Sequence, residues 1–221
     1  MKKRSKIIID LINNEISVEQ ALEALDFLLE DISDKKIKKW LTNELNGYTN
    51  EKDIPDYRYV HANIKGNYIA GRVKCTNQDI PIKPEKIENF YTIKMNQPVA
   101  QIQQFSLAEK EGKEHSLTMP LHAVIAQDIS LINGEVISAY RELSLYAFTN
   151  ILSKIKSKLL NIFKELEKQY GNLDNYYIDF EDKNKANQVA KSLITIINDN
   201  STHIGDNNTI KKSTIGDNNE N

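Results

Sequence analysis

The densest group of ionisable side chains in this chain consists of Glu44, Asp53, Asp56, Arg58 and His61. Carboxylates and an imidazole gathered in this way are what a divalent metal ion needs to support phosphodiester cleavage. The same residues also fit a structural interpretation, in which a carboxylate at a helix end pairs with an arginine and the others are loop charges. We favour the structural interpretation, because ion-pair networks are commoner than active sites among such clusters.

Sequence motifs of established enzyme classes are missing. The chain contains no P-loop, no G-x-G-x-x-G, no G-x-S-x-G and no H-E-x-x-H. Its histidines, His61, His115, His122 and His203, have no metal-ligand spacing, and Cys75 is the only cysteine that could join them. We therefore expect no metal site, no cofactor and no recognisable catalytic mechanism.

The cluster is positioned by the run from Trp40 to Arg58, WLTNELNGYTNEKDIPDYR, in which a helix ends and a β-rich body begins. Asn46-Gly47 is typical of a helix stop, since glycine tolerates the left-handed conformation after the last turn. Pro55 favours an extended chain in the residue before it. Tyr48, Tyr57 and Arg58 also fit a recognition surface, because aromatic residues and arginine anchor many interfaces.

This run carries a family resemblance. ELNGY at positions 44–48, followed by PDYR at 55–58, resembles the AbiTii domain of bacterial abortive-infection proteins. The resemblance continues through Asn133-Gly134, AYREL at 139–143 and the helix at 151–167, and so spans most of 1–171. It implies phage defence by altruistic growth arrest or death, with a phage or host protein as partner, and brings no catalytic mechanism. The signature residues, as binding or structural candidates, are Glu44, Asn46, Gly47, Tyr48, Pro55, Tyr57 and Arg58.

Charge and composition narrow the class of protein. The 221 residues include 29 basic and 31 acidic side chains, and a net charge of -2 gives no general reason to expect nucleic-acid binding. The lysines around position 37 are interrupted by acidic residues, as on a solvated helix face. One cysteine fits a reducing compartment, and no apolar run approaches the ~20 residues that span a bilayer. We predict a cytoplasmic protein that does not enter a membrane.

Hydrophobic periodicity predicts an α+β fold. An N-terminal helical unit covers about 1–47 and includes a capping box, Ser17 to Gln20. A mixed body over about 48–199 contains a small, mostly antiparallel sheet with a long helix packed across it. Gly66-Asn67 suggests a hairpin turn between two strands. The pattern also predicts a helix over 121–132 and a final helix near 185–197.

The long helix has the strongest pattern, with Ser144 as its expected cap. Apolar residues follow a 3-4-3-4 spacing, which is typical of a coiled-coil seam. Further apolar residues widen this stripe, so we interpret it as the central core helix of the domain. The alternative is a helix that also packs against its copy in an oligomer. The seam residues are Leu145, Phe148, Leu152, Ile155, Leu159, Ile162 and Leu166.

The last residues, 200–221, form a tail with a different composition. IGDNN occurs twice, at 204–208 and 215–219, and Ile204, Ile210 and Ile215 are its only large apolar residues. The repeat resembles a single coil of a β-helix, which cannot bury its own apolar face. The tail is therefore either disordered or completed by identical tails. We predict a homo-oligomer, with a trimer favoured over a dimer, that depends on these three isoleucines.

Overall fold

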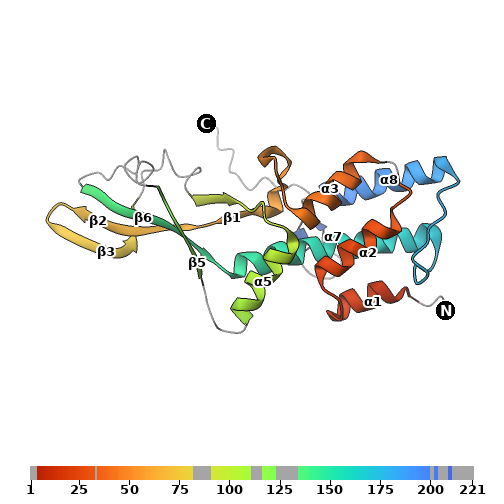
Figure 1. Ribbon diagram of the computed structural model, residues 1–221, viewed down its shortest axis with the longest axis horizontal. Helices are drawn as coiled ribbons and strands as arrows, with labels where there is room; N and C mark the ends of the chain where they lie inside the picture. Colours follow the sequence, from red (N-terminus) through yellow and green to blue (C-terminus); the bar gives the residue numbers. More distant parts are fainter. Residues whose placement is uncertain are drawn as a thin grey trace, which may run out of the picture.

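The computed structural model describes residues 4–32, 34–81, 91–110, 116–122, 134–199, 202–203 and 209–210. The molecule is elongated, with a bundle of helices at one end and a twisted sheet at the other (Figure 1). Its strands pair antiparallel, so the predicted α+β class is confirmed. The junction between bundle and sheet contains the Trp40–Arg58 run.

The first three helices form the N-terminal unit, and the predicted capping box and glycine stop are both present. Helix α1 (Lys6–Asn13) ends where Asn14 takes a left-handed φ of 59°. Helix α2 (Val18–Leu28) begins with the predicted capping box, in which Ser17 and Gln20 bond each other's backbone N–H. Helix α3 (Lys35–Asn46) is capped by Asp34 and ends before Gly47.

Among the described residues, three later helices also belong to the bundle: α5 (Val99–Lys110), α7 (Tyr146–Tyr170) and α8 (Lys183–Asn198). Helix α7 contacts α1, α2, α5 and α8 and so lies at the centre of the bundle. The sequence pattern predicted that this helix packs across the sheet. It packs against other helices instead, and these cover its apolar stripe. Leu145, rather than the predicted Ser144, is the N-cap, although Ser144 Oγ accepts a bond of 3.3 Å from Tyr146 N.

The seam of α7 is buried inside the single chain. Leu145, Phe148, Ile155, Leu159, Ile162 and Leu166 are at most 1% exposed, and only Leu152 is half-buried. Ile151 and Phe163 are buried beside them, which widens the stripe as expected for a core helix. The core interpretation is confirmed, and these side chains are not available for packing against a second copy.

The sheet at the far end has the order β3-β2-β6-β5. Its strands are β2 (Asn63–Ala70), β3 (Val73–Asp79), β5 (Ser116–Pro120) and β6 (Gly134–Ser144). A separate pair, β1 (Tyr59–His61) with β4 (Thr92–Lys94), joins this sheet region to the bundle. Val60 and Ile93 from this pair are part of the main core.

The predicted hairpin turn at Gly66-Asn67 is wrong. Both residues lie within β2, and the chain turns instead at Gly71-Arg72, where Gly71 has a φ of 61°. Gly66 is needed for close strand contact, because a Cβ there would lie 2.0 Å from the carbonyl oxygen of Ser138 on β6. The sequence signal marked a close backbone approach rather than a turn.

Parts of the predictions lie outside the described residues. These are the helix over 121–132 beyond His122, together with Asn133, Ile204 and Ile215. Within the tail, β7 (Thr202–His203) pairs antiparallel with β8 (Thr209–Ile210), with Thr202 opposite Ile210.

Candidate functional site

Three short segments bring the signature residues together. Glu44 is in the last turn of α3, and Tyr48 follows one residue after Gly47. Tyr57 and Arg58 lie in η2 (Asp56–Arg58), a single 3₁₀ turn that begins after Pro55. Tyr48 N donates a 2.8 Å bond to the carbonyl of Asn96, which fixes the chain after the helix end.

Gly47 makes this corner possible. Its φ is 90°, a conformation that side chains rarely adopt, and a Cβ on it would lie 2.8 Å from Asn96 O. Asn46 is the last residue of α3. The Asn-Gly pair therefore ends the helix, as predicted, and lets the chain pass close to the segment before α5.

Glu44 is the centre of the resulting network. Arg58 Nη2 donates to Oε2 at 2.6 Å, and Arg58 Nε donates to Oε1 at 3.2 Å. Oε1 also accepts from the hydroxyls of Tyr48 at 2.5 Å and Tyr57 at 2.6 Å. The side chains of Glu44 and Arg58 are both 0% exposed. The carboxylate thus accepts four hydrogen bonds and has no contact with solvent.

The other terminal nitrogen of Arg58, Nη1, bonds to two backbone carbonyls. Nη1 donates to the carbonyl of Met95 at 3.2 Å and to that of Gln97 at 2.7 Å. The guanidinium carbon lies 4.9 Å from the centre of the Tyr48 ring, within cation–π range. Arg58 therefore ties the end of α3 to the segment between β4 and α5.

The electrostatics of the network fix its protonation. Burial, followed by the negative charge of Glu44, raises the pKa of Tyr48 and of Tyr57 well above the ordinary value, so both remain hydrogen-bond donors. Burial alone lowers the pKa of Arg58, but the Glu44 carboxylate outweighs burial, and the net shift is upward. The upward shifts move the pKa values of Tyr48, Tyr57 and Arg58 further above neutral pH, so none of these three side chains can exchange a proton there as acid–base catalysis requires.

The network extends to a residue that sequence reasoning missed. Trp40 Nε1 donates to Tyr57 Oη at 2.9 Å, and the Lys158 ammonium of α7 lies 5.2 Å from the Tyr57 ring centre. Lys158 also donates to three carbonyls at the end of α8, those of Ile196, Ile197 and Asp199, at 3.2, 3.0 and 2.6 Å. In the sequence Lys158 is one of several lysines beside the seam, and nothing distinguishes it.

The other members of the ionisable cluster do not converge on Glu44. Asp53 pairs with Lys39 at 2.8 Å, and His61 stacks on Tyr91 with ring centres 5.3 Å apart. Asp56 lies in η2. Among the residues that the structure describes, no three His, Cys, Asp or Glu side chains form a group that could hold a metal ion. The interpretation of this region as a metal-dependent nuclease is not supported.

Fold and site together define an α+β protein in which the densest ionisable cluster joins a helical bundle to a sheet. The chain matches the AbiTii family over residues 5–191, and it belongs to that family. The family indicates a role in phage defence by abortive infection. No curated protein and no solved structure matches the chain. None of the described helices is both long enough and apolar enough to cross a membrane.

Proposed function

We propose that this protein acts in abortive infection as a non-enzymatic module that oligomerises and, through contact with a phage or host protein, arrests growth. The observation that carries the proposal is the state of Glu44. A base or metal ligand needs a free lone pair and access to its substrate. Glu44 accepts bonds from Arg58, Tyr48 and Tyr57 and is not exposed, so it serves to hold the corner together.

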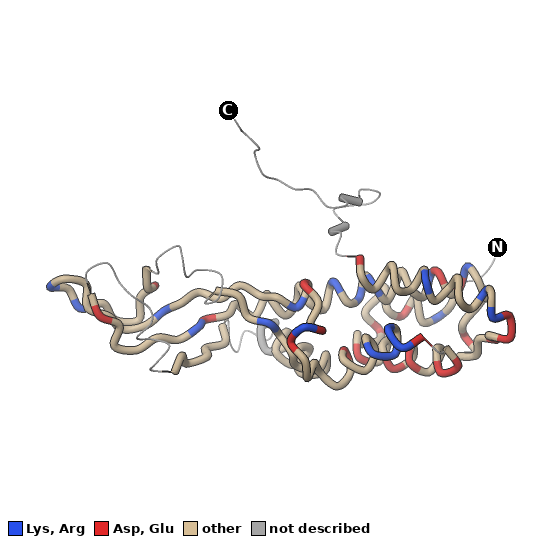
Figure 2. The backbone as a smooth tube through the Cα atoms, turned by 90° about the horizontal axis from the view of Figure 1, so that it is seen from above, with Lys and Arg blue, Asp and Glu red and all other residues tan. Residues whose placement is uncertain are grey.

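The surface charge also favours protein contacts over nucleic-acid binding. Figure 2 shows basic and acidic residues interspersed along the bundle rather than separated on two faces. A nucleic-acid-binding protein usually presents a continuous basic stripe, which attracts phosphates over a long range. The net charge of -2 points the same way.

The C-terminal tail is the segment that we expect to mediate assembly. Ordering a residue costs about 1–2 kcal/mol, and three isoleucines offset only a small part of that cost for the whole tail. Three tails side by side would place nine isoleucines against one another, as in an intertwined β-helix. Because the α7 seam is buried within the chain, it cannot provide the second contact that its spacing suggested.

Light scattering on the intact protein and on a chain that ends at Asn200 tests the proposed assembly. We expect a trimer for the intact protein and a monomer for the shorter chain. Replacing Ile204, Ile210 and Ile215 by serine should act like the truncation. Ile12→Ser is the matched control, since Ile12 is 52% exposed on α1. A monomer in both chains would contradict the proposal, and a trimer that survives truncation would place the interface on the folded domain.

A nuclease assay tests the non-enzymatic part. Purified protein is incubated with DNA and RNA in the presence of magnesium or manganese. We expect no cleavage above that of a mock preparation. Metal-dependent cleavage that Glu44→Gln abolishes, in a variant that remains folded, would refute the proposal.

A further inference from the structure

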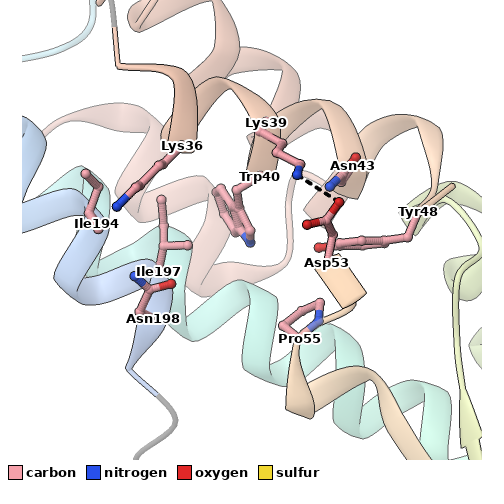
Figure 3. Close-up of a pocket in the computed structure, with 10 residues that line it drawn as sticks. All are labelled: Lys36, Lys39, Trp40, Asn43, Tyr48, Asp53, Pro55, Ile194, Ile197 and Asn198. Atoms are coloured by element: carbon pink, nitrogen blue, oxygen red, sulfur yellow. Dashed lines mark ion pairs between the residues drawn. The ribbon is translucent and has the colours of Figure 1, made fainter. Parts of the chain in front are cut away.

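A groove of about 290 Å³ lies between α3, η1 (Glu51–Asp53) and the last turns of α8. Figure 3 shows the side chains of α3 on one side of the groove and those of α8 on the other. The volume is at the lower end of the range that small-molecule sites occupy in proteins. The lining residues that matter here are Lys36, Lys39, Pro55, Ile194, Ile197 and Asn198.

The middle of the groove is apolar. Ile194, Ile197 and Pro55 are half-buried and line the groove, so each presents part of its side chain to it. Figure 3 shows Ile197 extending from α8 toward α3, with Pro55 farther along the groove. A ligand with an apolar body would remove this apolar surface from water, which favours its binding.

The two lysines of the groove differ in their partners. Lys39 Nζ pairs with Asp53 Oδ2 at 2.8 Å, so its charge is neutralised (Figure 3). For Lys36, no acidic partner is found in the part of the chain that the structure describes. Its ammonium extends from α3 toward Ile194 and Ile197 on α8 (Figure 3). One end of the apolar groove therefore has one available positive charge.

This end of the groove also has an uncharged polar group. The side-chain amide of Asn198, the last residue of α8, lies on the side of the groove opposite Lys36 (Figure 3). An ammonium and an amide N–H are both donors, so together they suit a carboxylate, which accepts hydrogen bonds at both oxygens. Apolar surface next to the ammonium strengthens such a pair, because the local dielectric constant is lower than in bulk water.

The number of available charges limits the class of ligand. A phosphate ester carries up to two negative charges and several acceptor oxygens, which a single lysine does not match. A carboxylic acid carries one negative charge on a small group, and the rest of the molecule can be apolar. The small volume favours a short or branched body over a long chain.

We propose that this groove binds a small carboxylic acid with a branched apolar body. The carboxylate pairs with Lys36 and Asn198, and the apolar body lies against Ile197 and Pro55. Such a ligand bridges α3 and α8 directly before the tail begins. The inference goes beyond the proposed function and does not depend on it, since binding requires neither assembly nor a partner protein.

Methyl NMR on the full chain tests the site, with isocaproate as the probe and its uncharged amide, isocaproamide, as the matched compound. We expect isocaproate to shift the δ1 methyl signals of Ile194 and Ile197, with a dissociation constant on the order of 1–10 mM for a ligand of about eight non-hydrogen atoms. The δ1 methyl of Ile12, which is 52% exposed on α1, is the internal control and should not move.

Two lysine variants test the assigned contact. The amide should bind the parent protein about threefold more weakly than the acid, as expected for an exposed charge pair. In Lys36→Met the acid and the amide should bind equally. Lys52→Met is the matched control and should keep the preference for the acid, because Lys52 is an exposed lysine of η1 that does not line the groove.

The titration measures binding and not oligomeric state, so its failure is distinguishable from failure of the assembly proposal. Unchanged Ile194 and Ile197 signals up to about 100 mM isocaproate would overturn the site. A parallel shift of Ile12 would mean unspecific binding to exposed apolar groups, which also overturns it. Equal binding of acid and amide to the parent, or a preference that survives Lys36→Met, would refute the role of Lys36.

Discussion

Replacing Arg58 by alanine should strongly destabilise the protein. The substitution leaves the Glu44 carboxylate in a site that is 0% exposed, with only the hydroxyls of Tyr48 and Tyr57 as partners. It also removes the donors to the carbonyls of Met95 and Gln97. Removing one member of a buried ion pair costs about 3–5 kcal/mol. For a chain of this length, that corresponds to a fall in Tm of roughly 6–20 °C.

Urea denaturation followed by circular dichroism measures this loss, with two matched variants beside it. Lys39→Ala breaks an exposed pair with Asp53 and should cost about 1 kcal/mol or less. The double variant Glu44→Gln/Arg58→Met removes both charges, while the glutamine Oε1 still accepts from both tyrosines, so it should recover part of the Arg58→Ala loss. If the free energy of unfolding of Arg58→Ala lies within about 1 kcal/mol of the parent's, the network does not hold the corner and this reasoning is refuted.

Three further predictions concern other elements. Gly66→Ala should lower the free energy of unfolding by more than about 2 kcal/mol, because the new Cβ meets the carbonyl of Ser138. Gly71→Ala, in open space at φ 61°, should lower it by only about 1 kcal/mol. Equal losses of stability in urea denaturation would contradict this prediction. Burial would raise the pKa of Glu167, but hydrogen bonds from Ser5 and the charge of Arg4 lower it below the ordinary value of 4.5. The stabilisation by the Glu167 carboxylate is therefore present above pH 4.5 and is lost as the pH falls through the lowered pKa. Glu167→Gln should flatten the acid limb of a pH–stability curve, and an unchanged limb would contradict this prediction. Lys158→Met should speed amide hydrogen exchange in the last turn of α8, with about 1 kcal/mol or less lost globally; unchanged exchange there would show that Lys158 does not cap the helix.

Local signals in the sequence predicted most of the helices. The Ser17 capping box and the Gly47 stop act between neighbouring residues, and the α7 pattern shows which face is buried. The pairing of Glu44 with Arg58 was also accessible, since both flank one predicted corner. Its complete burial was not, because that depends on carbonyls of Met95 and Gln97, which lie far along the chain.

Features that depend on contacts distant in sequence were misjudged or missed. Gly66-Asn67 has the composition of a turn, but β6 pairs along the whole of β2 and makes a continuous strand. The amphipathic α7 fits a sheet-packing helix or a bundle helix equally well by periodicity. Lys158 acquires its role only because α8 ends beside it. Spacing along one segment carries no information about such partners.

The central claim is that the Glu44–Arg58 network holds the fold together and performs no chemistry. The most direct measurement is the efficiency of phage plating on cells that express Glu44→Gln/Arg58→Met, once the variant has been shown to be folded and to have the parent's oligomeric state. We predict that protection is retained, because the neutral pair preserves the corner without the carboxylate. Loss of protection in a folded variant with unchanged assembly would contradict the account and assign the Glu44 carboxylate a functional role.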